Sequence, residues 1–123
     1  LYNHYRDKSA VVEALLASEV ARITELAKIA GTPADALESL SIAISGDRAL
    51  AGLRDHDPAV VAQLLIHSEH PLYLELARVV FAQTQSQSAT GLAMRWLLGQ
   101  VVQPLTPEQS REQAALLVEN TLF

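Results

Sequence analysis

Apolar residues recur at intervals of three and four positions in the first quarter of the chain, which is the period of one face of an α-helix. Charged residues such as Glu13 and Arg22 fall largely outside this set. The pattern predicts a helix from about Lys8 to Ala30, ended by Gly31 in the left-handed conformation that often follows a last helical turn. The apolar set is Val12, Leu15, Leu16, Val20, Ile23, Leu26 and Ile29.

Four prolines stand where further helices would begin, because the first helical turn has no use for the backbone N–H that proline lacks. Thr32 and Thr106 precede two of them as N-cap residues, and Gln109 completes a capping box with Thr106. These signals predict several helices joined by short turns. The four prolines are Pro33, Pro58, Pro71 and Pro107.

Two interior stretches decide how the helices are divided. Gly46 interrupts the apolar stripe of the second helix, and Asp47 can cap a shorter helix that follows. Farther along, the polar residues 83–91 separate two apolar segments. Because this stretch holds no proline, and serine and glutamine tolerate a helix, we predict one long helix from Pro71 to about Gln100. The alternative is two helices that meet at the polar stretch.

Composition favours an all-α fold of one domain. Hydrophobic residues make up 50% of the 123, and alanine and leucine dominate among them; these two are the strongest helix formers. The chain has no cysteine, which excludes disulfides and thiolate metal sites and suits a reducing cytoplasm. No apolar run reaches membrane-spanning length, so no membrane partner is expected.

The first eight residues concentrate two tyrosines, a histidine and two basic side chains in the sequence Leu-Tyr-Asn-His-Tyr-Arg-Asp-Lys. Asp7 suits an N-cap of the first helix, which would place Lys8 on the first turn beside unpaired backbone N–H groups. Such a helix start is suited to hold a phosphate. The net charge of −5 argues against a nucleic-acid-binding surface over most of the chain. A phosphate contact is therefore expected at this end only.

This opening resembles the end of the DNA-binding domain of the tetracycline-repressor family of transcriptional regulators (TetR family), whose pattern is Thr-Leu-Tyr-x-His-Phe-x-x-Lys before a long helix. Tyr5 stands where the family prefers Phe. The resemblance implies that residues 1–8 end a truncated helix-turn-helix domain and that residues 9–123 form a multi-helix effector-binding and dimerisation domain. It further implies DNA phosphate contacts by Tyr2, His4 and Lys8. The alternative is a partly packed terminus with a solvated lysine.

The resemblance also implies a homodimer, because the family's regulators pair through two C-terminal helices in an intermolecular four-helix bundle. Small residues on the predicted long helix would let two backbones approach closely. The alternative is that the same residues face the subunit's own core. The expected interface residues are Ser86, Ala89, Ala93, Leu97, Val118 and Leu122.

An effector pocket is a further implication of the resemblance. Pockets for small molecules combine apolar and aromatic walls with a few polar groups. The candidate lining residues are His67, Tyr73, Phe81 and Trp96. An alternative for Trp96 is an anchor in the core or in a dimer interface.

Metal and catalytic sites are not expected. His67 and His70, with Glu69 between them, form the one metal-like group, and zinc usually takes three or four convergent ligands. The chain has no Gly-x-Ser-x-Gly turn and no glycine-rich phosphate loop. We therefore expect no metal, no cofactor and no enzymatic activity.

The expected function is ligand-responsive transcriptional regulation, by a repressor that a small-molecule effector releases from a double-stranded DNA operator. A ligand that favours a different tilt of the helix Lys8–Ala30 would move the two DNA-binding segments of a dimer out of register. The alternative is a helical dimerisation or protein-interaction module with no DNA or ligand role.

Overall fold

A computed structural model describes the backbone of residues 2–66 and 69–121, and the side chains from residue 10 onward except at 64 and 120–121. Over these ranges the chain is all-α, as predicted, and has no strand. The helices are α1 (Tyr2–Lys28), α2 (Pro33–Ser45), α3 (Arg48–His56), α4 (Pro58–Ile66), α5 (Pro71–Thr84), α6 (Gln87–Val102) and α7 (Pro107–Thr121).

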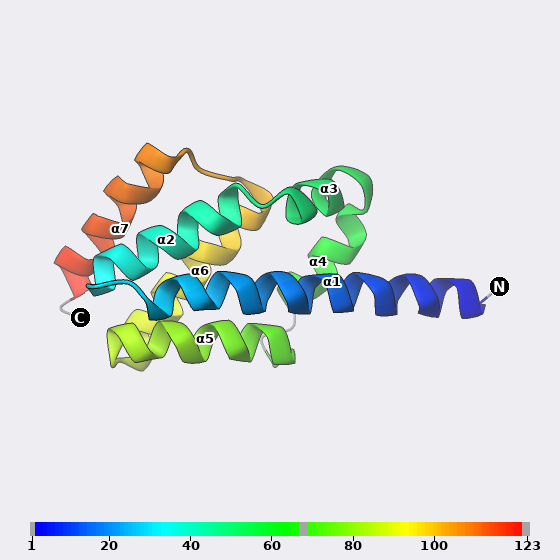
Figure 1. Cartoon of the computed structure of the whole chain (residues 1–123), viewed down its shortest axis with the longest axis horizontal. Coiled ribbons are helices and arrows are strands. Elements are labelled where there is room, and N and C mark those ends of the chain that lie inside the picture. The colour runs from blue at the N-terminus through cyan, green and yellow to red at the C-terminus, as the bar shows by residue number, and fades with distance from the viewer. Residues whose placement is uncertain (1, 67–68, 122–123) are drawn as a thin grey trace.

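The longest helix, α1, lies between α2 and α5 in the view of Figure 1, and its N-terminal end projects beyond the other helices. Its C-terminal part packs against α2 and α5. Helix α2 is central, because it also packs against α6 and α7. The core lies where α2, α5 and α6 meet, and its largest fully buried apolar side chains are Leu37, Leu40, Val80, Met94 and Leu97.

Helix starts follow the predicted caps. The Thr32 hydroxyl accepts from the backbone N–H of Asp35 at 3.1 Å, at the start of α2. At the start of α7 the Thr106 hydroxyl accepts from the Gln109 N–H at 3.2 Å, and the Gln109 side chain accepts from the Thr106 N–H at 3.0 Å. This reciprocal pair is the predicted capping box. The division of α2 from α3 after Gly46 is also confirmed.

The predicted single helix from Pro71 to Gln100 is wrong, because α5 and α6 are separate. Gln85 adopts the left-handed conformation (φ 56°), and the Ser86 hydroxyl caps α6 by accepting from Ala89 N–H at 3.2 Å. The Thr84 hydroxyl lies 2.6 Å from that of Thr90 and 3.0 Å from the Ser86 carbonyl oxygen. Hydroxyl groups here bond the local backbone in place of a continued helix, a competition typical of serine and threonine.

The predicted start and end of the first helix also need correction. Helix α1 begins at Tyr2, so Asp7 and Lys8 lie inside it and Asp7 does not occupy the predicted N-cap position. No glycine or proline interrupts residues 2–8, so the helix continues through them. At the other end α1 stops at Lys28, and Gly31 has no positive φ.

A polar network lies inside the core between α2, α6 and α7. The hydroxyl oxygens of Ser41 and Ser45 each lie 2.6 Å from Gln100 Oε1, and Ser41 Oγ lies 2.6 Å from Ser110 Oγ. The Ser45 hydroxyl accepts from the Leu105 N–H at 3.0 Å, which ties in the loop before α7. Ser41 of α2 joins all three helices, because it contacts Gln100 of α6 and Ser110 of α7.

Candidate ligand cavity

An apolar cavity of about 110 Å³ lies between α1 and helices α2 to α6. Helix α1 contributes four of the lining residues: Leu16, Glu19, Val20 and Ile23. The rest of the lining comes from α2, α3, α4, the start of α5, and α6. These residues are Ile44, Leu50, Leu53, Val61, Leu65, His70, Leu72, Tyr73, Leu76, Leu98 and Val101.

His70 joins α1 to the start of α5 at the edge of this cavity. Its Nδ1 accepts from the Leu72 backbone N–H at 3.1 Å and so caps α5. Its Nε2 lies 2.7 Å from Glu13 Oε1. Because Nδ1 is an acceptor, the ring proton is on Nε2 and is donated to the Glu13 carboxylate. The imidazole is therefore neutral in this arrangement, and both of its nitrogens are hydrogen-bonded.

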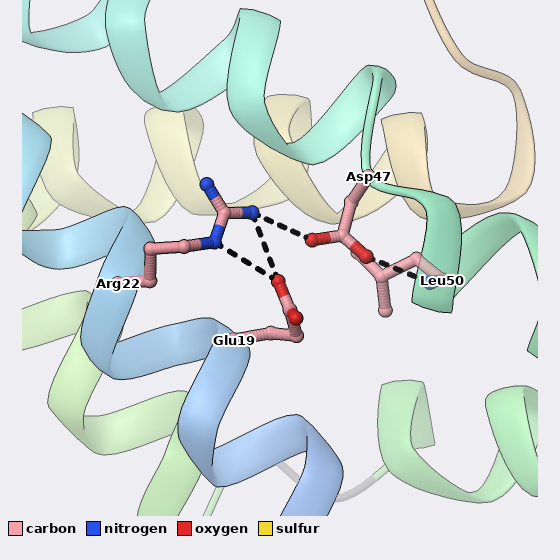
Figure 2. A network of polar contacts seen from close by, with 4 residues as sticks. All are labelled: Glu19, Arg22, Asp47 and Leu50. Atoms are coloured by element: carbon pink, nitrogen blue, oxygen red, sulfur yellow. Dashed lines mark hydrogen bonds and ion pairs between the residues drawn. The ribbon is translucent and has the colours of Figure 1, made fainter.

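A second contact ties α1 to the turn between α2 and α3 (Figure 2). Arg22 Nη2 lies 2.9 Å from Glu19 Oε2 and 2.9 Å from Asp47 Oδ2. The other Asp47 oxygen accepts from the Leu50 N–H at 2.9 Å and caps α3, as predicted from the sequence. The Asp47 carboxylate thus has two roles: one oxygen forms an ion pair with Arg22 of α1, and the other caps α3.

The pKa of Asp47 is lowered. Burial acts in the opposite direction and is the largest single influence, while the hydrogen bonds from the Leu50 N–H and from Arg22, together with the Arg22 charge, lower the pKa. A lowered carboxyl pKa means that the charged form stabilises the fold. This stabilisation is complete above the pKa of the unfolded chain and is lost as pH falls through the folded value, below about pH 4.

We expect Asp47→Asn to lower the free energy of unfolding by about 1 kcal/mol at pH 7, because the amide keeps the cap of α3 but loses the charge that Arg22 contacts. Chemical denaturation of both proteins between pH 7 and pH 3 tests this. The difference should shrink below about pH 4. Asp55→Asn, at an exposed position of α3, is the matched control. A difference that stays constant down to pH 3 would argue against a stabilising carboxylate at Asp47.

The predicted pocket residues do not converge. Tyr73 lines the cavity, but Phe81 and Trp96 do not. Phe81 is an exposed residue of α5, and Trp96 donates from its indole N–H to Gln113 Oε1 at 2.7 Å, so it links α6 to α7. His67 lies outside the described residues. Helical period alone places these aromatics on a helix face but does not say which faces meet.

The predicted dimer residues on α6 are buried in the subunit's own core. Ala89 is 4% exposed, and Ala93 and Leu97 are 0% exposed, so in this structure they pack against their own subunit. Ser86 is the cap of α6, and Val118 packs partly buried against the core. The small side chains serve the close packing of α6 inside one subunit. Leu122 lies outside the described residues.

The predicted DNA contacts fall at the projecting end of α1. The backbone of Tyr2, His4 and Lys8 is helical, and their side chains lie outside the described part of the chain. The next residues, 10–15, include none that is buried; Val11 is 68% exposed. Leu16 is the first buried residue of the described part of α1.

Across the described residues, none of the helices combines the length and apolar character that crossing a membrane requires. Comparison with known proteins finds no matching family model, no matching curated protein and no matching solved structure. The function of the chain has to be inferred from its own residues.

Proposed function

We propose that this chain is the ligand-sensing part of a DNA-binding transcriptional regulator similar to those of the TetR family, and that it acts as a homodimeric repressor released by a small molecule. One observation carries the proposal: α1 both begins with the family-like motif and forms one wall of the apolar cavity. A single rigid helix therefore connects the expected phosphate contacts with the expected effector site.

The burial pattern of α1 supports separate roles for its N-terminal end, which would contact DNA, and its packed part, which lines the cavity. Residues 10–15 have no buried member, whereas Leu16 and Ile23 are 4% and 3% exposed. The exposed N-terminal part projects from the helical body (Figure 1). A helix rises about 1.5 Å per residue, so a small tilt about the packed part becomes a larger displacement at Tyr2.

The size of the cavity supports a coupling between ligand and helix. Pockets for drug-sized ligands occupy about 300–1,000 Å³, and the cavity has about 110 Å³. A ligand of ordinary size therefore enters only if a wall moves. Helix α1 is held to the opposite walls by two polar contacts, Glu13 with His70 and Arg22 with Asp47. The side chains of Glu13 and Arg22, which α1 contributes to these contacts, are both exposed to solvent. Such contacts are weak, so a bound ligand can replace them.

The proposed mechanism is a shift between two positions of α1. In a dimer that binds DNA, two recognition elements sit about 34–36 Å apart, one turn of the double helix. A ligand that binds more tightly when α1 is tilted away from the body populates the position in which this spacing is lost. Operator affinity then falls by the ratio of the ligand's affinities for the two positions.

We expect Lys8→Ala, made in the full-length product of the gene, to weaken binding to all DNA sequences alike and to reduce the slope of log affinity against log salt concentration by about one. The reason is the loss of one phosphate contact. Lys28→Ala, at the other end of α1, is the matched control and should change neither quantity. Binding titrations on specific and unrelated duplexes over a salt series measure both. An unchanged affinity and slope for Lys8→Ala would remove Lys8 from the DNA-binding surface.

A further inference from the structure

The polar groups on the cavity wall are largely satisfied by the protein itself. The lining has three polar side chains: Glu19, His70 and Tyr73. Glu19 Oε2 accepts two hydrogen bonds from Arg22, at 2.9 and 3.2 Å, and both ring nitrogens of His70 are engaged. A polar group on a ligand would have to displace one of these bonds, and would gain little net free energy by the exchange.

The charges around the cavity disfavour an anion. Glu13 and Glu19 place two carboxylates on the α1 side. The nearby cation, Arg22, is held between Glu19 and Asp47, and His70 is neutral while it caps α5. Among the described lining residues there is no lysine or arginine. An anionic ligand would lose its hydration and meet like charge.

The same surroundings disfavour a cation. Glu13 does not line the cavity and its side chain is 57% exposed, and Glu19 already pairs with Arg22. The rest of the wall is aliphatic except for Tyr73, so an ammonium group inside the cavity would exchange its hydration for little more than the ring and hydroxyl of Tyr73.

The cavity is also small. An engineered protein cavity of about 150 Å³ lined by apolar side chains is known to hold benzene, and the one described above has about 110 Å³. A molecule with a single ring is therefore about the largest ligand that the cavity encloses.

We infer that the ligand of this cavity is a small, uncharged, apolar molecule of about the size of one substituted ring, recognised by shape and by exclusion of water. This inference rests on the proposed function in one respect only, that the cavity is a ligand site. It excludes carboxylate and ammonium compounds with the same apolar group as effectors.

The test is a matched series of probes that share one ring and differ in charge: toluene, benzoate and the benzylammonium ion. Methyl NMR titrations of the protein at neutral pH give the affinity and the site of each. Toluene is expected to produce saturable shifts at Val20, Val61 and Leu65, and to bind at least about tenfold more tightly than either ion. Equal or tighter binding of an ion at these residues overturns the inference, and so do toluene shifts that are absent or confined to other residues.

Two variants check the location. Leu98 lines the cavity and Leu117 does not, although both pack partly buried against the core. Leu98→Trp should fill the cavity and weaken toluene binding at least about tenfold, whereas Leu117→Trp should bind it as the unmodified protein does. Toluene binding that is unchanged in folded Leu98→Trp overturns the inference. If this variant does not fold, the toluene shifts at Val20, Val61 and Leu65 of the unmodified protein decide whether the inference holds.

Failure here is distinguishable from failure of the proposed function, because none of these measurements includes DNA. A result in which an ion binds best rejects the ligand class and leaves a ligand-sensing regulator possible. A protein that binds toluene as expected but does not bind DNA keeps the ligand class and rejects the regulator.

Discussion

Gln100→Leu is expected to lower the free energy of unfolding by about 3 kcal/mol, because it removes the acceptor shared by the buried Ser41 hydroxyl and the partly buried Ser45 hydroxyl. Gln100 is 2% exposed, and its Oε1 accepts from the Ser41 and Ser45 hydroxyls at 2.6 Å each. Its Nε2 donates to the Trp96 carbonyl oxygen at 3.3 Å. Leucine has a similar volume, so the loss comes from hydrogen bonding and not from an empty space.

Urea denaturation of the purified variant measures this effect. Gln63→Leu, at an exposed position of α4, makes the same chemical change where water can replace the lost bonds. It should alter the free energy of unfolding by no more than about 0.5 kcal/mol. If the two variants were equally stable, the network between α2, α6 and α7 would not contribute to stability.

Local signals in the sequence were sufficient for most helix boundaries. The caps at Thr32, Asp47 and Thr106 each act within three residues, so a short stretch of sequence contains the whole interaction. The break at Gln85 was missed although its signals are also local. Threonine and serine hydroxyls can either tolerate a helix or bond the backbone of a turn, and their presence alone does not decide between these outcomes.

The cavity and the polar network could be predicted only in part, because both depend on which helix faces meet. Ser41 and Gln100 are 59 residues apart in the chain. The sequence predicts no metal site at His70, but it does not predict that His70 caps α5 and bonds Glu13, which lies 57 residues earlier in the chain. The sequence does not distinguish Tyr73 from Trp96 as a pocket residue. The packing of the helices places Tyr73 in the cavity wall and directs the Trp96 indole to Gln113 of α7. Contacts between distant segments leave no short-range pattern.

The same limit applies to the dimer. Small residues at helical spacing indicate close approach of another helix, and they do not say whether that helix belongs to the same subunit. For Ala89, Ala93 and Leu97 the approach is internal. The proposed homodimer therefore needs a surface other than these three residues.

The second large effect is expected on DNA binding when the cavity is filled. A substituted ring would occupy most of the cavity of about 110 Å³, and α1 is the wall that carries the expected DNA contacts. Coupling free energies between two sites are typically about 1–3 kcal/mol, which corresponds to about 5- to 150-fold in affinity. Leu98→Trp provides the control, because it should no longer bind the probe.

The most direct measurement is the affinity of the full-length gene product for a selected DNA duplex, with and without saturating toluene, at one fixed salt concentration. We expect toluene to weaken DNA binding at least about tenfold in the unmodified protein and to leave the affinity of Leu98→Trp unchanged. If DNA affinity stays the same while NMR shows the cavity occupied, then α1 does not transmit the state of the cavity, and the account of a ligand-sensing regulator is contradicted.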